Sequence, residues 1–232
     1  MKVLLIVPCF NEEENILKTT DNIKNSQMDL DYIIINDGST DKTLRICEEN
    51  NIPYIDLINN LGIGGAVQTG YKYAFENNYD IAIQFDGDGQ HDINYIKDLI
   101  EPLVQDKSDF VVGSRFLDKK DNFKSTKMRR IGKNVISALI RILTGKKITD
   151  PTSGFRACNK KVIKKFAEDY PKEYPEPVGI VTLLKNKYRI LEVPVEMKGR
   201  VGGVSSIKAW KAVYYMINVI LYMIIVSMRR DK

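Results

Sequence analysis

The chain is poor in the residues that most often build disulfides and transition-metal sites, because its 232 residues include only three cysteines and one histidine. Cys9, Cys47 and Cys158 lie far apart and form no Cys-x-x-Cys pair, so neither a disulfide framework nor a zinc site is expected. With His91 as its single histidine, the chain cannot form a site of several histidines. We therefore expect a reducing, cytosolic environment.

No low-complexity tract and no Pro/Gly/Ser-rich linker divides the chain, and its first residues, "MKVLLIVP", lack the length and cleavage site of a signal peptide. We expect one domain over residues 1–207 and a C-terminal segment over 208–232. The net charge of +5 would suit an anionic substrate or an acidic membrane surface. The lysines are dispersed and no aromatic-basic array accompanies them, so no nucleic-acid partner is expected.

Apolar strands alternate with helices in the first half of the chain. The expected strands are 2–8, 31–37, 53–58, 80–86 and 109–116, with helical stretches between them. Strands that are apolar throughout indicate a parallel sheet buried on both faces. The sequence therefore predicts an α/β, Rossmann-like fold with a mainly parallel sheet flanked by helices. In the second half we expect helices over 130–144 and 159–169, a turn-rich segment between them, and a strand within 188–200.

The C-terminal segment contains an uncharged stretch, residues 212–228. A helix that is apolar on every face must bury itself in protein or lipid, and this stretch is close to the roughly 17 residues that a short membrane span needs. Aromatic and basic residues flank it in the manner of interface anchors: Trp210, Lys211, Tyr214, Tyr215, Arg229 and Arg230. We expect membrane contact, peripheral or through this single helix, at the cytoplasmic face of the cell membrane. A core helix or a dimer-forming helix is the alternative.

Acidic side chains follow three of the expected strands: Glu12 after the first, Asp37 after the second, and Asp86 and Asp88 after the fourth. In a parallel sheet, ligands bind beyond the carboxyl ends of the strands, so we expect these side chains to line one crevice.

The stretch "FDGDGQHD" favours a divalent cation. Asp86 and Asp88 lie on the same face of an extended segment, where two carboxylates repel each other unless a positive charge lies between them. Oxygen ligands suit Mg²⁺ or Mn²⁺, and Gln90 could add a neutral oxygen. A solvated Asp-Gly turn is the alternative. A calcium loop is excluded, because His91 and Lys97 stand where its glycine and closing glutamate belong.

Asp37 is a candidate for recognition of a base. A carboxylate only accepts hydrogen bonds, so facing a nucleobase it would select the N–H groups of uracil, thymine or guanine. It could instead cap the following helix. The glycines of "NNLGIGGAVQTG" lack the spacing of a phosphate-binding loop and indicate close helix–strand packing.

Several motifs, in this order and spacing, resemble family 2 glycosyltransferases of the GT-A fold. They are "IVPCFNEEENI", "IINDGSTDKT", "NLGIGGAVQTGYKYA", "FDGDGQHD", "VVGSRF" and "DPTSGFRA". The closest similarity is to the branch that contains dolichol-phosphate mannose synthase and bacterial polyprenyl-phosphate glycosyltransferases. The resemblance covers about residues 1–207. Asn36 departs from it, since many members carry aspartate there.

The resemblance implies a set of site residues. Pro8, Phe10 and Glu12 match the positions that contact the nucleoside, and Ile35 and Asp37 match those that hold the base. The metal and diphosphate site corresponds to Asp86, Asp88 and Gln90. Basic residues associated with phosphate groups correspond to Arg115 and Arg200, and Arg130, or Arg129 beside it, is a further candidate.

The resemblance also implies an inverting displacement on a UDP-, GDP- or dTDP-linked sugar, with the acceptor a polyprenyl phosphate or a lipid-linked or cell-surface glycan. Asp88 and Arg115 would assist the departing diphosphate. A hydroxyl acceptor needs a general base, for which Asp150 is the first candidate and Glu176 the second. A lipid phosphate is already anionic and needs none, in which case Asp150 would bind or orient, and it could also simply start a turn. A homo-oligomer is possible.

Two other functions remain open from the sequence. A sugar-phosphate nucleotidyltransferase would have a glycine-rich basic loop after the first strand, where this chain has "NEEEN". A non-catalytic nucleotide-sugar-binding subunit is the other, although the presence of Asp86, Asp88 and Asp150 argues against it.

Overall fold

The computed structural model describes residues 1–26, 28–117, 127–197 and 209–229. Its strands are β1 (Val3–Cys9), β2 (Asp31–Asn36), β3 (Tyr54–Asp56), β4 (Ile81–Gln84), β5 (Phe110–Ser114), β6 (Arg156–Asn159) and β7 (Ile190–Pro194). Its helices are α1 (Ile16–Asn25), α2 (Thr43–Glu49), α3 (Gly62–Glu76), α4 (Ile96–Val104), α5 (Lys127–Thr144), α6 (Lys160–Glu168), α7 (Pro175–Lys185) and α8 (Ala209–Met228), with a 3₁₀ turn, η1 (Ile93–Tyr95).

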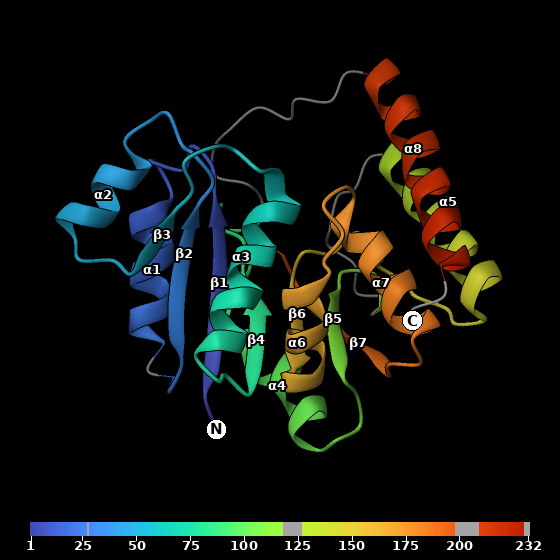
Figure 1. Ribbon diagram of the computed structural model, residues 1–232, viewed down its shortest axis with the longest axis horizontal. Coiled ribbons are helices and arrows are strands. Elements are labelled where there is room, and N and C mark those ends of the chain that lie inside the picture. The colour runs from blue at the N-terminus through green and yellow to red at the C-terminus, as the bar shows by residue number, and fades with distance from the viewer. Residues whose placement is uncertain (27, 118–126, 198–208, 230–232) are drawn as a thin grey trace.

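The seven strands form one sheet in the order β3-β2-β1-β4-β6-β5-β7 (Figure 1). β1 pairs in parallel with β2 and β4, β2 with β3, and β5 with β7. β6 lies antiparallel between β4 and β5. The predicted α/β fold with a mainly parallel sheet is therefore confirmed, with one reversed strand that the sequence did not predict.

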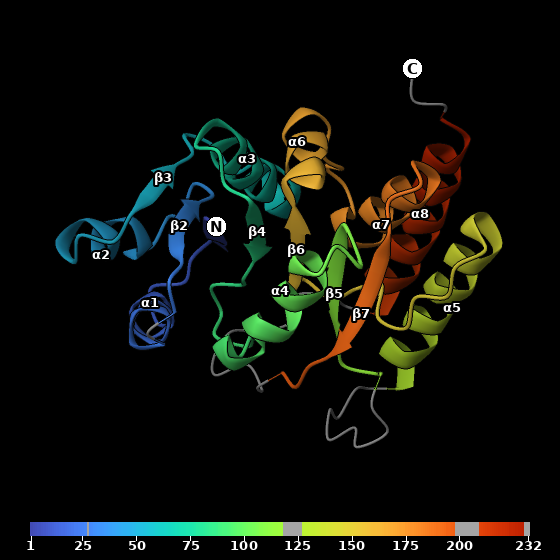
Figure 2. The same ribbon diagram turned by 90° about the horizontal axis from the view of Figure 1, so that it is seen from below.

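Helices cover both faces of this sheet, as Figure 2 shows: α3 and α6 on one face and α1 and α4 on the other. Alternate side chains of β1 pack in two hydrophobic cores, one on each face of the sheet. Leu4 and Ile6 pack in the core that includes α3 and α6, and Leu5 and Val7 in the core that includes α1 and α4. Because β1 and β4 are apolar on both faces, their first polar neighbours come only where the strands end.

The second half contains a strand and a helix that the sequence did not predict. β6 covers four residues and begins with Arg156, which is 1% exposed. The helix α7 begins with "PEP", and its Pro175 occupies the first turn, where the missing N–H breaks no helical hydrogen bond. β6 is too short to show a period, and α7 is apolar over most of its length, so neither segment shows the alternation of apolar and polar residues that identifies an element.

The last helix, α8, packs against α7 and α5 through one side. Val219 and Met223 are fully buried in the same core as α3 and α6, and the Tyr215 ring meets the Tyr174 ring edge-on at 4.7 Å. Of the alternatives for this segment, packing onto the domain is what the structure shows. In the described parts of the chain, no helix has the length and apolar character to cross a membrane. The predicted division at residues 207 and 208 falls outside the described residues and stays a prediction.

Candidate active site at the carboxyl ends of the strands

The loop after β4, residues 85–92, is packed tightly against the end of β1. A side chain at Gly87 would lie 2.5 Å from the Cys9 sulfur, so this position accepts only glycine without rearrangement. Thr19 of α1 donates its hydroxyl to the Gly87 carbonyl at 3.1 Å. Gly89 has a φ of +73°, in the left-handed region, where glycine is favoured. The loop therefore presents its carboxylates from a fixed backbone.

The carboxylates of this loop share one region with the acidic residue that follows β1. Burial raises the pKa of the Cys9 thiol, and the negative charges of Glu12, Asp86 and Asp88 raise it further. Cys9 therefore stays protonated and does not provide a thiolate. Acidic side chains from two strand ends thus lie close enough to act on one buried group.

The side chains of Asp86, Asp88 and Gln90 offer oxygen ligands of the kind that Mg²⁺ and Mn²⁺ prefer. The Asp86 side chain is 33% exposed. The Asp88 carboxylate accepts the Gln90 N–H at 3.1 Å, a contact that forms a turn within the loop. Among the described residues, no group of three or more His, Cys, Asp or Glu side chains could hold a metal ion alone. A divalent cation can also take oxygens from a bound phosphate, and cation binding by this loop stays a prediction.

His91 belongs to the same loop, and it is 5% exposed. Its ring is stacked on Phe155, with centroids 4.5 Å apart. Burial lowers the pKa of His91 to about 3, while Asp88 raises it and Arg115 lowers it. The imidazole is therefore neutral near pH 7. The influence of Arg115 also shows that the end of β5 lies within electrostatic reach of the loop after β4.

The residues predicted to contact a nucleoside lie at the ends of β1 and β2. Pro8 and Ile35 are partners in the parallel ladder, and the Ile35 side chain is fully buried, so only its backbone could meet a ligand. Phe10 is 47% exposed just beyond β1. The Glu12 N–H donates to the Thr43 hydroxyl at 2.9 Å, which ties the β1 loop to the start of α2. Their contacts with a nucleoside stay predictions.

Asp37 has an internal partner. It is 4% exposed, and its Oδ1 accepts the Leu61 N–H at 2.7 Å, at the start of α3. A side chain at the neighbouring Gly38, whose φ is +66°, would lie 2.9 Å from the Asn60 nitrogen. Asp37 thus fastens the β2 loop to α3 rather than capping α2. Recognition of a base by Asp37 stays a prediction.

Arg115 and Asp150 form a bidentate ion pair at the end of β5. The Arg115 Nε donates to Asp150 Oδ2 at 2.7 Å and Nη2 donates to Oδ1 at 2.8 Å. The backbone N–H of Arg115 donates to the same carboxylate at 3.1 Å. Asp150 is 0% exposed, whereas the Arg115 side chain is 18% exposed. Two parallel charge-assisted hydrogen bonds fix the plane of the guanidinium.

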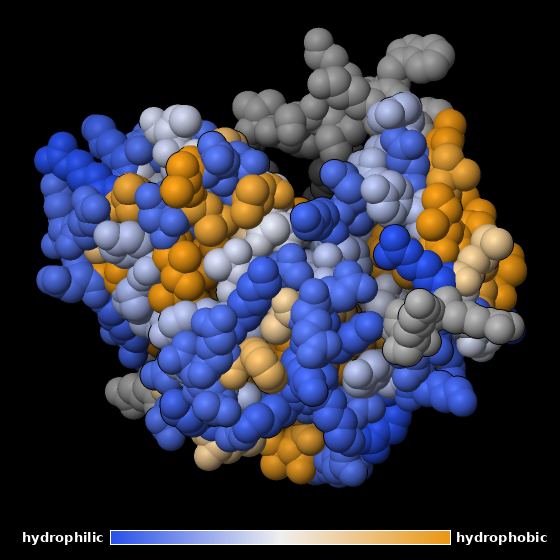
Figure 3. Space-filling view, viewed as in Figure 1, coloured by the Kyte–Doolittle hydropathy of each residue, from blue (hydrophilic) through white to orange (hydrophobic). Residues whose placement is uncertain are grey.

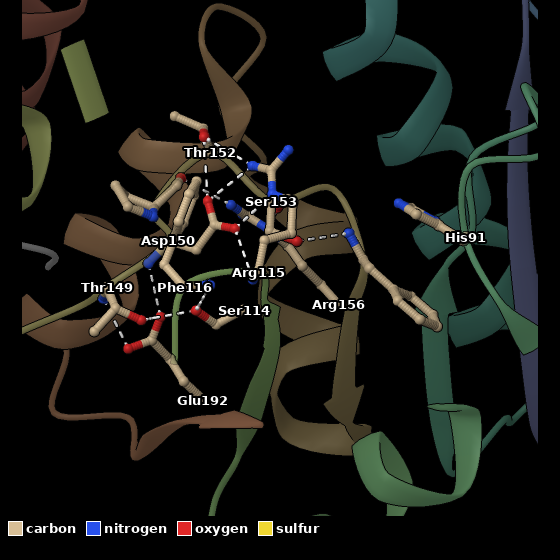
Figure 4. A network of polar contacts seen from close by, with 12 residues as sticks. His91, Ser114, Arg115, Phe116, Thr149, Asp150, Thr152, Ser153, Arg156 and Glu192 are labelled. Carbon is tan, nitrogen blue, oxygen red and sulfur yellow. Dashed lines mark hydrogen bonds and ion pairs between the residues drawn. The ribbon is translucent and has the colours of Figure 1, made fainter. Parts of the chain in front are cut away.

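Further polar groups enclose Asp150, as Figure 4 shows. Glu192 of β7 accepts the Asp150 N–H and the Thr149 N–H, each at 2.8 Å. The Thr149 hydroxyl lies 2.7 Å from that of Ser114. The Asp150 carboxylate is thus closed to solvent and engaged by Arg115, and its role as a general base stays a prediction.

Several residues that support the site were missed at the sequence level. Arg156 is buried on β6, and its guanidinium donates to three backbone carbonyls: those of Pro151, Ser153 and Glu176. Gln84 donates its amide to Asp86 at 3.4 Å. A side chain at Gly154 would lie 2.9 Å from Asp86 Oδ2. The motif "DPTSGFRA" was the one signal that could have pointed to Gly154 and Arg156.

Glu176, the second candidate base, lies in the first turn of α7 near this cluster. Burial raises its pKa, Arg156 lowers it, and Asp86 raises it. Glu176 is therefore within electrostatic reach of the loop after β4. Arg130 is exposed in the first turn of α5, and Arg200 lies outside the described residues. The roles of both arginines stay predictions.

The sequence and the fold are both similar to those of known sugar transferases. The profile of glycosyl transferase family 2 matches residues 4–167. UDP-N-acetylglucosamine–dolichyl-phosphate N-acetylglucosaminyltransferase of Methanococcus voltae is 33% identical over 213 residues, which cover 84% of each chain. Undecaprenyl-phosphate mannosyltransferase of Micrococcus luteus is 28% identical over 215 residues, which cover 89% of this chain and 87% of the relative.

Among solved structures, glucosyl-3-phosphoglycerate synthase of Mycobacterium tuberculosis, in complex with Mn²⁺, UDP-glucose and phosphoglyceric acid, superposes with a TM-score of 0.73. The match covers all of this chain and 81% of that one, at 17% identity. At this identity the likeness shows the fold alone, which is GT-A-like.

Proposed function

This chain is a family 2 glycosyltransferase, and we propose that it transfers a sugar, with inversion, from a nucleoside diphosphate to a polyprenyl phosphate. Family membership removes the sugar-phosphate nucleotidyltransferase and the non-catalytic subunit as alternatives. The two relatives described above are named for transfer to dolichyl phosphate and to undecaprenyl phosphate, which supports a lipid phosphate as the acceptor. The donor's base and sugar stay open among UDP-, GDP- and dTDP-linked sugars.

The pairing of Arg115 with Asp150 is the observation that carries this proposal. A hydroxyl acceptor needs a base that can take its proton, yet the buried Asp150 carboxylate is occupied by the guanidinium. A phosphate acceptor is already anionic and needs no base. Arg115, held in one plane by Asp150, is then suited to bind a phosphate oxygen of the donor or the acceptor.

The loop after β4 would hold the cation that stabilises the leaving group. A divalent cation bound by Asp86, Asp88 and Gln90 would neutralise the charge that develops on the departing diphosphate. The rigid backbone at Gly87 holds Asp86 and Asp88 in position beforehand, so little reorganisation is needed when the donor binds.

A hydroxyl acceptor, as in a lipid-linked glycan, is the second candidate, and Glu176 is the observation that favours it. A carboxyl group whose pKa is raised by burial is better suited to take a proton near neutral pH than an ordinary surface carboxylate.

Replacing Glu176 with glutamine separates these two acceptors. With a polyprenyl phosphate as acceptor, we expect the Glu176→Gln variant to transfer sugar at close to the wild-type rate, because no proton has to be removed. Loss of a general base would lower the rate by about 100-fold or more. Purified protein is supplied with each nucleotide-sugar and Mg²⁺ or Mn²⁺, and the sugar-phosphate lipid and its anomeric configuration are identified by mass spectrometry and NMR.

A product with the anomeric configuration of the donor would contradict inversion. Absence of product with every donor, from folded protein, would contradict the proposed acceptor. If the lipid product forms and Glu176→Gln abolishes it, the proposed reaction is right, but the expectation that it needs no carboxylate as a general base is wrong.

The exposed side of α8 supports contact with a membrane surface. Large apolar side chains are exposed along it: Tyr214, Ile217, Leu221, Tyr222, Ile225 and Met228. The space-filling view shows hydrophobic surface along the edge of the molecule that α8 occupies (Figure 3). On the neighbouring α5, Ile131 and Ile142 are exposed as well. We propose that this face lies on the cytoplasmic surface of the cell membrane, close to a lipid acceptor.

Acidic residues on this face test the proposal. The Leu221→Glu/Ile225→Glu variant should bind vesicles of anionic phospholipid at least about tenfold more weakly, because burial of two large apolar side chains is lost. Val104→Glu, an exposed apolar position on α4, is the matched control. Co-sedimentation measures the bound fraction. If binding stays the same while an oligomer dissociates, the face instead pairs with a second copy of the chain.

A further inference from the structure

The His91 ring is held in one orientation by its neighbours. It stacks on Phe155 with an interplanar angle of 14°, and it meets the Phe85 ring edge-on at 5.6 Å. Only 1% of the side chain is exposed. The His91 backbone also forms an antiparallel bridge with Met197. Rotation of this ring would disrupt the aromatic packing, so its two nitrogens keep fixed positions.

A hydrogen bond to the ring determines which nitrogen carries the proton. The Asp86 N–H donates to His91 Nδ1 at 3.0 Å. A ring nitrogen that accepts a hydrogen bond has no proton, so the proton of the neutral ring is on Nε2. That Nε2 lies 3.4 Å from Oδ2 of Asp86. One ring thus contacts both the backbone and the carboxylate of the same residue.

Two more neighbours limit the position of this carboxylate. Gln84 donates its Nε2 to Asp86 Oδ1 at 3.4 Å, so each carboxylate oxygen lies near an N–H group. Gly154 borders the same carboxylate so closely that an added Cβ would lie 2.9 Å from Oδ2. The Asp86 carboxylate is therefore oriented before any ligand arrives, and His91 is the neighbour that acts on it at two points.

We propose that His91 is a positioning residue: it holds Asp86 so that the carboxylate can bind the cation that accompanies the donor diphosphate. His91 acts through Asp86 and touches neither substrate nor cation. The need for a cation rests on the proposed function, whereas the contacts of His91 do not. Mutation of a residue that hydrogen-bonds to a metal ligand commonly lowers metal affinity by about 10- to 100-fold.

The tautomer can be tested in the protein without any ligand. His91 is the chain's only histidine, so the imidazole ¹⁵N signals of labelled protein belong to it alone. We expect an unprotonated Nδ1 and a protonated Nε2 in two-dimensional ¹⁵N–¹H spectra. A proton on Nδ1, or rapid exchange between both forms, would overturn the proposal even if sugar transfer is shown.

Binding experiments test the effect on Asp86. His91→Phe keeps an aromatic ring but loses both nitrogens, and we expect the affinity for UDP, GDP or dTDP, whichever binds, to fall about 10- to 100-fold with Mn²⁺ present. Without Mn²⁺, the affinity should not change. His91→Asn places an acceptor near the Asp86 N–H and should restore part of the loss. Isothermal titration calorimetry measures all of these values.

Phe155→Leu is the matched control, because it disturbs the stack and leaves both nitrogens. If His91 has only a structural role, Phe155→Leu and His91→Phe should lower the melting temperature by the same amount. Both variants should then keep the Mn²⁺ dependence of nucleotide binding. That result would overturn the proposal. If wild-type protein binds no nucleotide in a Mn²⁺-dependent way, the proposed function fails, and with it the cation that Asp86 would bind. The ¹⁵N–¹H spectra then still test whether His91 contacts Asp86 as proposed.

Discussion

Replacing Asp88 with alanine is expected to lower kcat/KM for sugar transfer by about three orders of magnitude, because several kcal/mol of charge stabilisation on the departing diphosphate is lost. Asp88 sits in the loop whose backbone is fixed by Gly87, and its carboxylate is one of two that a cation would share. Initial rates with saturating acceptor measure the loss. Calorimetric titration with UDP, GDP and dTDP, with and without Mn²⁺, shows whether donor binding is lost as well.

The control for this experiment is Asp92→Ala, four residues along the same loop. Asp92 accepts the Asn94 N–H at 3.1 Å and caps η1, so its loss removes a similar charge without removing a predicted ligand. We expect Asp92→Ala to bind nucleotide with the wild-type dependence on Mn²⁺. If Asp88→Ala and Asp92→Ala behave alike, the loop acts through net charge and the assigned cation site is wrong.

Local sequence patterns predicted the first half of the fold and the place of the site. β1, β2 and β4 are short runs that are apolar on both faces, and alternating with helices this pattern favours strands buried on both sides of a sheet. Once a parallel sheet is inferred, the positions of Glu12, Asp37 and Asp86 at one edge follow from the direction of the strands. This inference needs no knowledge of contacts distant in the sequence.

The second half could not be predicted in the same way, because long-range contacts determine it. β6 is antiparallel, and its Arg156 is buried among carbonyls of the 151–153 turn and of α7. With arginine as its first residue and asparagine as its last, this four-residue strand lacks the apolar pattern that would identify it. α8 reads as apolar on all faces, yet the structure divides it into a buried side with Val219 and Met223 and an exposed side.

The role of Asp150 illustrates the same limit. Its sequence context, "TDPTSGFR", is compatible with a catalytic base, a turn or a binding residue. Its partners Arg115 and Glu192 lie 35 and 42 residues away, so no local pattern could reveal the pairing. The structure shows that Asp150 pairs with Arg115, and experiments can distinguish whether Asp150 orients this arginine or takes a proton.

Replacing Asp150 with alanine should therefore lower the free energy of unfolding by about 3 kcal/mol, because it leaves Arg115 without its buried counter-charge. Transfer should fall as well, by about 100-fold, since an arginine that is free to move loses most of its contact with a phosphate oxygen. Urea unfolding and initial rates measure the two effects. Thr152→Val, which removes only contacts of 3.2 Å to the pair, is the control and should cost less than about 1 kcal/mol.

A double-mutant cycle with Arg115→Ala distinguishes orientation from base catalysis. If Asp150 acts through Arg115, removing both side chains should cost no more activity than Arg115→Ala alone, because residues in one network are not additive. If Asp150 takes a proton, the two losses should multiply, and Asp150→Asn should remove the acidic limb of the pH–rate profile. Multiplying losses would return Asp150 to the role of base and, with it, favour a hydroxyl over a phosphate as the acceptor.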